Sequence, residues 1–316
     1  MAARENMKIN LMFPGQGAQF TGMGLDFYKE YEEYRSLIEE ASSVCDVDLL
    51  EILQDEERLS ETENTQIAIF TMSYGIASLL RKEGVEADHA LGLSLGEYGA
   101  LTYGGALNPL DTLKILRRRS DLMQEAAQET RGFLAAVSFM DLAQVEEAVN
   151  KISGVTISNY NAPKQTVVGG EVEKKAEFEE GIRALGGKKI TYLPVSGAFH
   201  TPLMKKAALR FQEYLKDFTL NDPEISVLSN YKGDFYERGE DYREILTKHI
   251  DHPVKLRDCL ERLDSREEDV HILLGPGKAL GSLVKQNRLK GRVYMINSVE
   301  DFKQTVKELK EKNNGK

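Results

Sequence analysis

A serine stands between two glycines in the segment ALGLSLGEYGAL, residues 90–101, as Gly92-Leu-Ser94-Leu-Gly96. The flanking residues predict a short buried strand, a sharp turn and then a helix. In such a turn the glycines remove Cβ atoms that would collide, and the serine hydroxyl is exposed. The motif alone also fits a structural turn, but the strand-to-helix context favours a nucleophile. It places the N–H of Leu95 near a helix N-terminus, where it can stabilise an oxyanion.

A nucleophilic serine needs a base, and the chain has five histidines. His89 and His271 fall in or beside predicted buried strands, where a structural role is expected. His200 lies in a loop, in the segment VSGAFHTPLM, directly before Thr201 as the expected N-cap of a helix. Loops held on a scaffold are where catalytic groups concentrate. His200 is therefore the candidate base, and an ordinary surface histidine is the alternative.

An arginine on an apolar helix face is the third candidate. The segment 111–129 predicts a helix with Asp111 as N-cap, and its apolar stripe contains Ile115, Leu116, Leu122 and Met123. Arg119 projects within this stripe, whereas Arg117 and Arg118 project outside it. A buried guanidinium needs an anionic partner, either an internal carboxylate or a substrate carboxylate gripped by two hydrogen bonds; snorkelling from the edge of the stripe is a further possibility.

Two glycine-rich loops show no sign of nucleotide binding. FPGQGAQFTGMG, residues 13–24, has neither the Lys-Ser/Thr of a P-loop nor the G-x-G-x-x-G spacing, and fits a loop that donates a backbone N–H to a site. GPGKALGSL, residues 275–283, reads as a tight turn into a helix. No cluster has the spacing of a metal site, so we expect neither a metal nor a cofactor.

The composition excludes several classes of protein. The 316 residues are 41% hydrophobic and 29% charged, which is ordinary for a soluble globular protein. No apolar run approaches a membrane span, and the N-terminus has no apolar signal core. The net charge of −10 argues against general nucleic-acid binding. With only two distant cysteines, Cys45 and Cys259, we expect a cytoplasmic protein with reduced thiols.

The order of predicted elements indicates an α/β protein with two subdomains. Strand-helix-strand-strand-helix-strand over about 132–195 is the order of a ferredoxin-like unit. It interrupts a larger α/β pattern of strands and helices with a parallel sheet. We therefore expect a large subdomain of residues 7–130 and 197–305, and an inserted small subdomain of residues 131–196.

Seven segments together resemble the malonyl-CoA:acyl carrier protein transacylase family of fatty acid synthesis. They are FPGQGAQ, GLSLGEYGAL, RRSDLMQ, NYNAPKQTVVGG, LPVSGAFHTPLM, HIDHPV and GPGKALGSLVK, in the family's order from about residue 8 to 300. The resemblance implies a hydrolase-like α/β core with a ferredoxin-like subdomain. It implies that Ser94 is acylated, that His200 is its base, and that the N–H groups of Gln16 and Leu95 form the oxyanion hole. Arg119 matches the arginine that binds the malonyl carboxylate.

The resemblance also assigns residues around these groups. His249 stands where the family commonly has glutamine, and its backbone carbonyl would orient His200. Asn161 lies in a matching motif near the site. Phe199 resembles the bulky residue of malonyl-accepting rather than methylmalonyl-accepting enzymes. Leu93 departs from the family, which often has histidine there, and so removes one polar group near the malonyl position.

The expected function is transfer of malonyl from malonyl-CoA to the phosphopantetheine thiol of an acyl carrier protein through a malonyl-serine. We expect a monomer whose partners are malonyl-CoA and the carrier protein. Because carrier proteins are usually acidic, Lys188, Lys189, Lys205 and Lys206 are candidates for a basic docking patch; scattered solvated lysines are the alternative. The rival functions are a freestanding acyltransferase serving a polyketide synthase, an acyl thioester hydrolase, and a non-enzymatic carrier-binding module.

Overall fold

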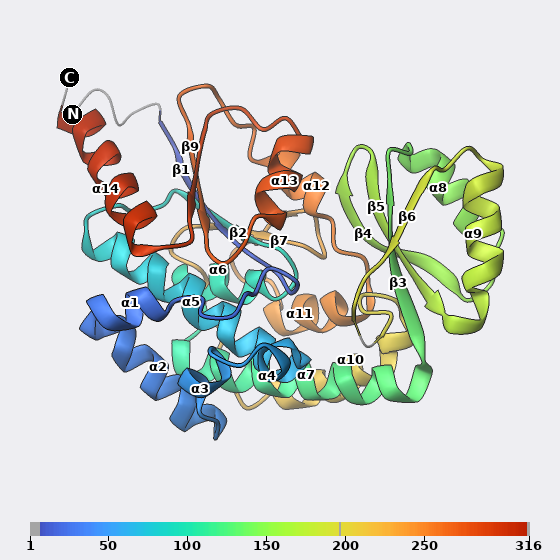
Figure 1. Ribbon diagram of the computed structural model, residues 1–316, viewed down its shortest axis with the longest axis horizontal. Coiled ribbons are helices and arrows are strands. Elements are labelled where there is room, and N and C mark those ends of the chain that lie inside the picture. Colours follow the sequence, from blue (N-terminus) through green and yellow to red (C-terminus); the bar gives the residue numbers. More distant parts are fainter. Residues whose placement is uncertain (1–6, 196, 315–316) are drawn as a thin grey trace.

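The computed structural model describes residues 7–195 and 197–314 and contains two separate β-sheets (Figure 1). Ser196, the last residue of the expected small subdomain, lies outside the described residues. The larger sheet and its helices form one body. The smaller sheet, with α8 (Leu142–Val149) and α9 (Lys175–Ala184), is set to one side of it (Figure 1).

The larger sheet has six strands in the order β10-β9-β1-β2-β7-β8. Its strands are β1 (Ile9–Phe13), β2 (His89–Gly92), β7 (Ser226–Ser229), β8 (Asp234–Phe235), β9 (Val270–Leu274) and β10 (Arg292–Ile296). All neighbouring pairs are parallel except β7 and β8. The central strands INLMF and VHILL are buried throughout, as expected when helices cover both faces of a parallel sheet.

Three helices of the large body carry residues of the candidate site. They are α5 (Thr62–Lys82), α6 (Gly96–Tyr103) and α7 (Pro109–Thr130). Every residue of α6 is buried, and α5 is buried over most of its length. Because α6 begins directly after β2, the strand-turn-helix expected around Ser94 is confirmed.

The other helices of the large body come before α5 or after the small sheet in the chain. Before α5 they are α1 (Leu25–Glu30), α2 (Glu32–Cys45), α3 (Leu49–Ile52) and α4 (Glu56–Ser60). After the small sheet they are η2 (Pro202–Met204), α10 (Lys205–Leu215), α11 (Tyr242–Asp251), α12 (Leu256–Arg262), α13 (Ala279–Gln286) and α14 (Val299–Asn314).

The smaller sheet is antiparallel, with strand order β4-β5-β3-β6. Its strands are β3 (Gly132–Ser138), β4 (Val155–Ala162), β5 (Gln165–Glu171) and β6 (Lys189–Tyr192), and η1 (Val172–Lys174) precedes α9. With α8 and α9 packed on it around a core of its own, this is the ferredoxin-like arrangement expected from the element order. β4 contacts the large body through the backbone, because the Val254 N–H donates to the Ser158 carbonyl (2.8 Å).

Some expected helix boundaries are wrong. Asp111 is not the N-cap of α7: the helix starts two residues earlier, with Pro109 at its first turn, and the side chain of Asn108 accepts from the Leu110 N–H (2.9 Å). The residue pattern of 25–44 also predicts one continuous helix, but the extended backbone of Tyr31 separates α1 from α2. Within the described residues, no helix is both long enough and apolar enough to cross a membrane.

Candidate active site

The turn after β2 forces Ser94 into an unusual backbone conformation. Its φ is 54°, in the left-handed region that residues other than glycine rarely adopt. A Cβ on Gly92 would lie 1.9 Å from the Gly96 carbonyl carbon, and one on Gly96 would lie 2.3 Å from the Phe13 carbonyl oxygen. Glycine is therefore required on both sides of the serine, because the backbone approaches too closely for any side chain.

The hydroxyl of Ser94 meets the imidazole of His200. Their Oγ and Nε2 atoms are 2.7 Å apart, and Nδ1 of His200 lies 2.6 Å from the carbonyl oxygen of His249. A carbonyl only accepts, so Nδ1 bears the proton and Nε2 presents a lone pair to the serine. Burial, and next the charge of Arg119, lower the pKa of His200 to about 3 against a partial increase from the His249 carbonyl. The imidazole is thus neutral and able to take the serine proton.

Arg119 is the one arginine of its helix that is buried. Its side chain is 1% exposed, and it donates from Nη2 to Ser94 Oγ (3.2 Å) and from Nη1 to Gln66 Oε1 (2.7 Å). The ring centroid of Tyr98 lies 5.5 Å from its guanidinium carbon. Burial lowers its pKa. No ion pair of Arg119 with a carboxylate occurs in residues 7–195 and 197–314, so the alternative of an internal salt bridge is wrong there.

The loop after β1 packs directly against the serine turn. The Leu93 N–H donates to the Phe13 carbonyl (3.0 Å), and a Cβ on Gly15 would lie 2.6 Å from the Leu93 carbonyl oxygen. Gln16 follows in this loop and Leu95 follows the serine, while the next N–H groups, from Gly96 onward, already donate within the turn. This packing brings the segments of the two expected oxyanion donors into contact.

The loop that carries His200, the candidate base, is held from two sides. The Phe199 carbonyl accepts from the hydroxyl of Ser158 on β4 (2.9 Å), and the Phe199 side chain is buried beside His200 in the chain. His200 itself has a left-handed φ of 58°. The rings of His200 and His249 stack with centroids 4.9 Å apart. The small sheet and α11 therefore both fix the loop that presents the base.

Asn161 and Leu93 differ in the groups that they contribute near the site: one is polar and the other is apolar. The Asn161 carbonyl accepts from Asn287 Nδ2 (2.9 Å), while its side-chain oxygen is buried without a hydrogen-bond partner among the described residues. Leu93 is half-buried and packs against the apolar cluster that includes Met12 and Leu91. The position commonly occupied by histidine in the family thus adds apolar packing here.

Three residues around the candidate pair escape sequence reasoning. Gln66 on α5 accepts from Arg119, and Asn230 accepts the Ser94 N–H on its Oδ1 (2.8 Å). Glu97 on α6 is fully buried and accepts from the Asn230 N–H. Asn230 does have a signal: it directly follows the buried strand β7, at the carboxyl edge of a parallel sheet, where ligands bind in such folds. Glu97 is a carboxylate in a helix with no exposed face, which itself predicts buried partners.

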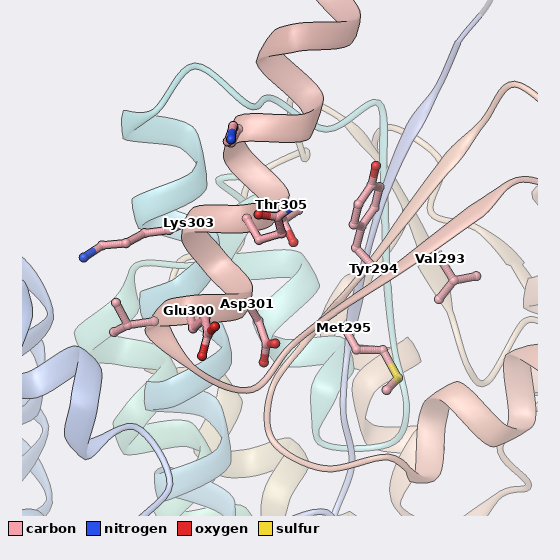
Figure 2. A pocket seen from close by; sticks show the side chains of 10 residues that line it. Val293, Tyr294, Met295, Glu300, Asp301, Lys303 and Thr305 are labelled. Atoms are coloured by element: carbon pink, nitrogen blue, oxygen red, sulfur yellow. The ribbon is translucent and has the colours of Figure 1, made fainter.

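A separate cavity of about 750 Å³ lies between β10 and α14 (Figure 2). Among its lining residues, Lys303 pairs with Glu30 and Tyr294 donates to Glu308 (3.2 Å), so their polar groups bond to surface partners. Figure 2 shows the labelled carboxylates Glu300 and Asp301 on α14, and the residues that line this cavity include no histidine or cysteine. Within the described residues no group of three or more potential metal ligands occurs.

The chain matches the model of the acyl transferase domain family over residues 11–288. It is 32% identical to the malonyl CoA-acyl carrier protein transacylase of Bacillus subtilis, over 97% of this chain and 98% of that protein. It is 33% identical to the protein of the same name from Staphylococcus aureus, over 94% of this chain and 97% of that protein.

Solved structures agree with this match. The malonyl CoA-acyl carrier protein transacylase of Clostridium perfringens superposes with a TM-score of 0.91 at 34% identity, over 97% of this chain and 98% of that one. A malonyl-transacylase in complex with a type II polyketide synthase acyl-carrier protein superposes with a TM-score of 0.90 at 27% identity, over 95% and 99%. The similarity therefore covers both sheets and the segments that meet at Ser94.

Proposed function

Because the chain belongs to the acyl transferase family, among the malonyl-CoA:acyl carrier protein transacylases, we propose that Ser94 and His200 perform its transfer of malonyl from malonyl-CoA to acyl carrier protein. The substrate is malonyl-CoA and the acceptor is the thiol of a carrier protein. The product supplies fatty acid or polyketide synthesis.

One observation supports malonyl as the acyl group most strongly. The buried guanidinium of Arg119 touches the Ser94 hydroxyl, and its nearest polar partners are neutral. A buried cation without a carboxylate is costly, so an incoming carboxylate is stabilised there. The free carboxylate of malonyl meets this need, whereas an acetyl group leaves the charge unpaired.

The first half-reaction forms a malonyl-serine. His200 Nε2 takes the hydroxyl proton while Ser94 Oγ attacks the thioester carbonyl, and the resulting oxyanion lies between the N–H groups of Gln16 and Leu95. When the carbonyl re-forms, the carbon–sulfur bond breaks and His200 returns the proton to the leaving CoA thiol. The His249 carbonyl stabilises the charged imidazole between these two transfers.

The second half-reaction repeats the chemistry with a new thiol. His200 takes the proton of the phosphopantetheine thiol of the carrier protein, and the thiolate attacks the malonyl ester. The ester bond breaks, and Ser94 recovers its proton from His200. Phe199 limits the space beside the base and favours an unbranched acyl chain, and the free side-chain oxygen of Asn161 is a candidate acceptor for substrate.

The chain itself supplies the nucleophile, the base and the oxyanion donors, so we propose that the transfer uses no metal or cofactor. We place the reaction in the cytoplasm; Cys45 and Cys259, both buried and free, suit a reducing compartment. A thioester hydrolase would have the same serine turn, but it gains nothing from a buried cation beside the nucleophile.

The experiment is the intact mass of the protein after brief exposure to malonyl-CoA, with acetyl-CoA and Ser94→Ala in parallel. We expect a malonyl adduct on the unmodified sequence alone. Release of CoA without an adduct would indicate a hydrolase, and neither adduct nor CoA would refute malonyl transfer. Adding carrier proteins of fatty acid and polyketide synthesis to the adduct then shows which one accepts the malonyl group.

A further inference from the structure

The carboxylate of Glu97 lies behind the catalytic pair and binds groups from separate parts of the chain. The Tyr236 hydroxyl donates to its Oε1, and the Asn230 N–H donates to its Oε2 (2.9 Å). Nδ1 of His249 lies 3.3 Å from the same Oε2. Glu97 and His249 are both 0% exposed. The Tyr236 hydroxyl and the Asn230 N–H would both be left unsatisfied in the core if the carboxylate were removed.

The first of these contacts leads to the nucleophile. Asn230 is fixed through its backbone by Glu97, and its side chain binds the serine turn twice. Its Oδ1 accepts from the Ser94 N–H (2.8 Å), and its Nδ2 donates to the Gly92 carbonyl (2.8 Å). These two bonds hold the backbone on both sides of Leu93, where Ser94 is in its left-handed conformation. A shift of Asn230 would therefore shift the nucleophile.

The second contact leads to the base. His249 offers its carbonyl to His200 Nδ1 (2.6 Å), and its ring stacks on the His200 ring at an interplanar angle of 23°. Among the described residues, neither ring nitrogen of His249 has a hydrogen bond. The approach of Nδ1 to Glu97 is the one polar contact the ring makes there. At this position, where the resemblance implies glutamine, an imidazole faces Glu97.

We propose that Glu97 is a positioning residue for both members of the catalytic pair, holding Ser94 through Asn230 and His200 through His249. The inference rests on the proposed function, because positioning matters only if this pair reacts. It requires His249 to be neutral with its proton on Nδ1, donating to the carboxylate. Burial supports the neutral form, since it lowers the pKa of His249 well below its usual range.

The kinetic test compares Glu97→Met, which keeps the length but removes both acceptors, with Glu97→Gln, which keeps an acceptor. Asn10→Leu is the matched control: Asn10 is 1% exposed, and its side chain bonds to His89 (2.8 Å) and His271 (3.1 Å) rather than to residues around Ser94. The measured quantities are kcat and KM for acylation of Ser94 by malonyl-CoA, together with the melting temperature of each variant.

We expect Glu97→Met to lower kcat about 10- to 100-fold with KM nearly unchanged, because a small displacement of reacting groups costs rate rather than binding. Glu97→Gln should recover most of the loss, and Asn10→Leu should lose stability but little rate. A folded Glu97→Met protein that acylates at the rate of the unmodified sequence would overturn the proposal. So would an equal loss of rate in Asn10→Leu at equal melting temperature.

A second measurement needs no variant and so does not depend on Glu97→Met folding. Nitrogen-15 NMR of the histidine rings at pH 8 reports which nitrogen of His249 is protonated. A proton on Nδ1 supports the contact with Glu97, and a proton on Nε2 refutes it. If the unmodified protein is not acylated by malonyl-CoA, the proposed function fails, while the NMR result still decides whether Glu97 holds His249.

Discussion

The Nη2 atom of Arg119 lies 3.2 Å from the hydroxyl oxygen of Ser94, so the buried guanidinium and the proposed nucleophile are in direct contact. The same guanidinium contributes to the low pKa of His200. When a substrate carboxylate pairs with Arg119, that positive charge is neutralised and the pKa of the base rises. A malonyl substrate would therefore both pair with Arg119 and raise the pKa of His200. An acetyl thioester has no carboxylate and would do neither.

Replacing Arg119 should reduce discrimination between substrates more than it reduces reactivity in general. In Arg119→Gln we expect acylation by malonyl-CoA to fall about 100- to 1,000-fold, the loss typical of a buried charged pair, while acylation by acetyl-CoA stays level or rises. Arg119→Lys should recover little, because an ammonium lacks the planar fork. Quenched-flow mass spectrometry of both acyl-enzymes gives the ratio. An unchanged ratio would show that Arg119 does not bind the malonyl carboxylate.

The low pKa of His200 predicts the acid side of the pH profile. Since the free base remains deprotonated until the pH approaches about 3, kcat/KM for acylation should show no decline between pH 8 and pH 5. An unperturbed histidine would instead produce a decline near pH 6.5. Stopped-flow measurement of CoA release across this range decides between them. Because Glu97 has a pKa of about 7, the same measurement on Glu97→Gln removes its contribution. An inflection near pH 6.5 that persists in Glu97→Gln would mean that burial and Arg119 leave the pKa of His200 at its ordinary value.

Glu97 should make stability fall as the pH rises. Burial raises its pKa from the ordinary value of 4.5 to about 7, so between those values the unfolded chain loses the proton while the folded protein keeps it. Unfolding then releases a proton, and the free energy of unfolding decreases as pH rises through this window. Five titratable or charged groups face this carboxyl: Tyr98 on its own helix, Arg119, Tyr236, His249 and Cys259.

Glu97→Gln isolates this effect, because glutamine does not titrate while the buried histidines titrate in both proteins. Urea unfolding at several pH values should show the unmodified protein losing stability relative to Glu97→Gln between about pH 4.5 and 7. A difference between the two proteins that is constant over this range would mean that Glu97 ionises normally in the folded state.

The four candidate docking lysines should not contribute equally. Lys205 pairs with Asp251 (3.4 Å) and Lys206 with Glu129 (2.8 Å), whereas Lys188 and Lys189 have no ion pair with another described residue. We expect Lys188→Glu with Lys189→Glu to slow transfer to an acidic carrier protein about tenfold at low salt, with acylation by malonyl-CoA unchanged. The same reversal at 205 and 206 is the matched comparison. Equal loss in both half-reactions would refute docking through these residues.

Helix phase predicted the burial of Arg119 correctly, because helix phase depends only on neighbouring positions in the chain. Arg117, Arg118 and Arg119 are consecutive, yet only the third lies in the apolar stripe of α7. In the structure the side chains of Arg117 and Arg118 are 30% and 36% exposed and pair with surface carboxylates, while Arg119 is 1% exposed. The serine turn was predictable for the same reason, since its glycines and flanking strand are adjacent in the chain.

The partners of Glu97 could not be predicted, because their contacts depend on tertiary structure. Residues 97, 230, 236 and 249 are brought together by α6, by the turns beside β7 and β8, and by α11. No helix or strand periodicity relates these positions, and each polar side chain taken alone would be predicted to lie on the surface. The start of α7 was missed for a smaller reason: both Asn108 and Asp111 are good capping residues, and the side chain of Asn108 makes the bond.

Ser94 and His200 share a property that neither needs for proton transfer: both have backbones in the left-handed region, with φ of 54° and 58°. For residues with a Cβ, this conformation costs about 1 to 2 kcal/mol each. The surrounding hydrogen bonds hold both turns in place, and relaxation of either turn would recover this cost. On heating, the reactive geometry should therefore loosen before the sheets melt, so that the temperature at which activity ends lies below the temperature at which the fold is lost.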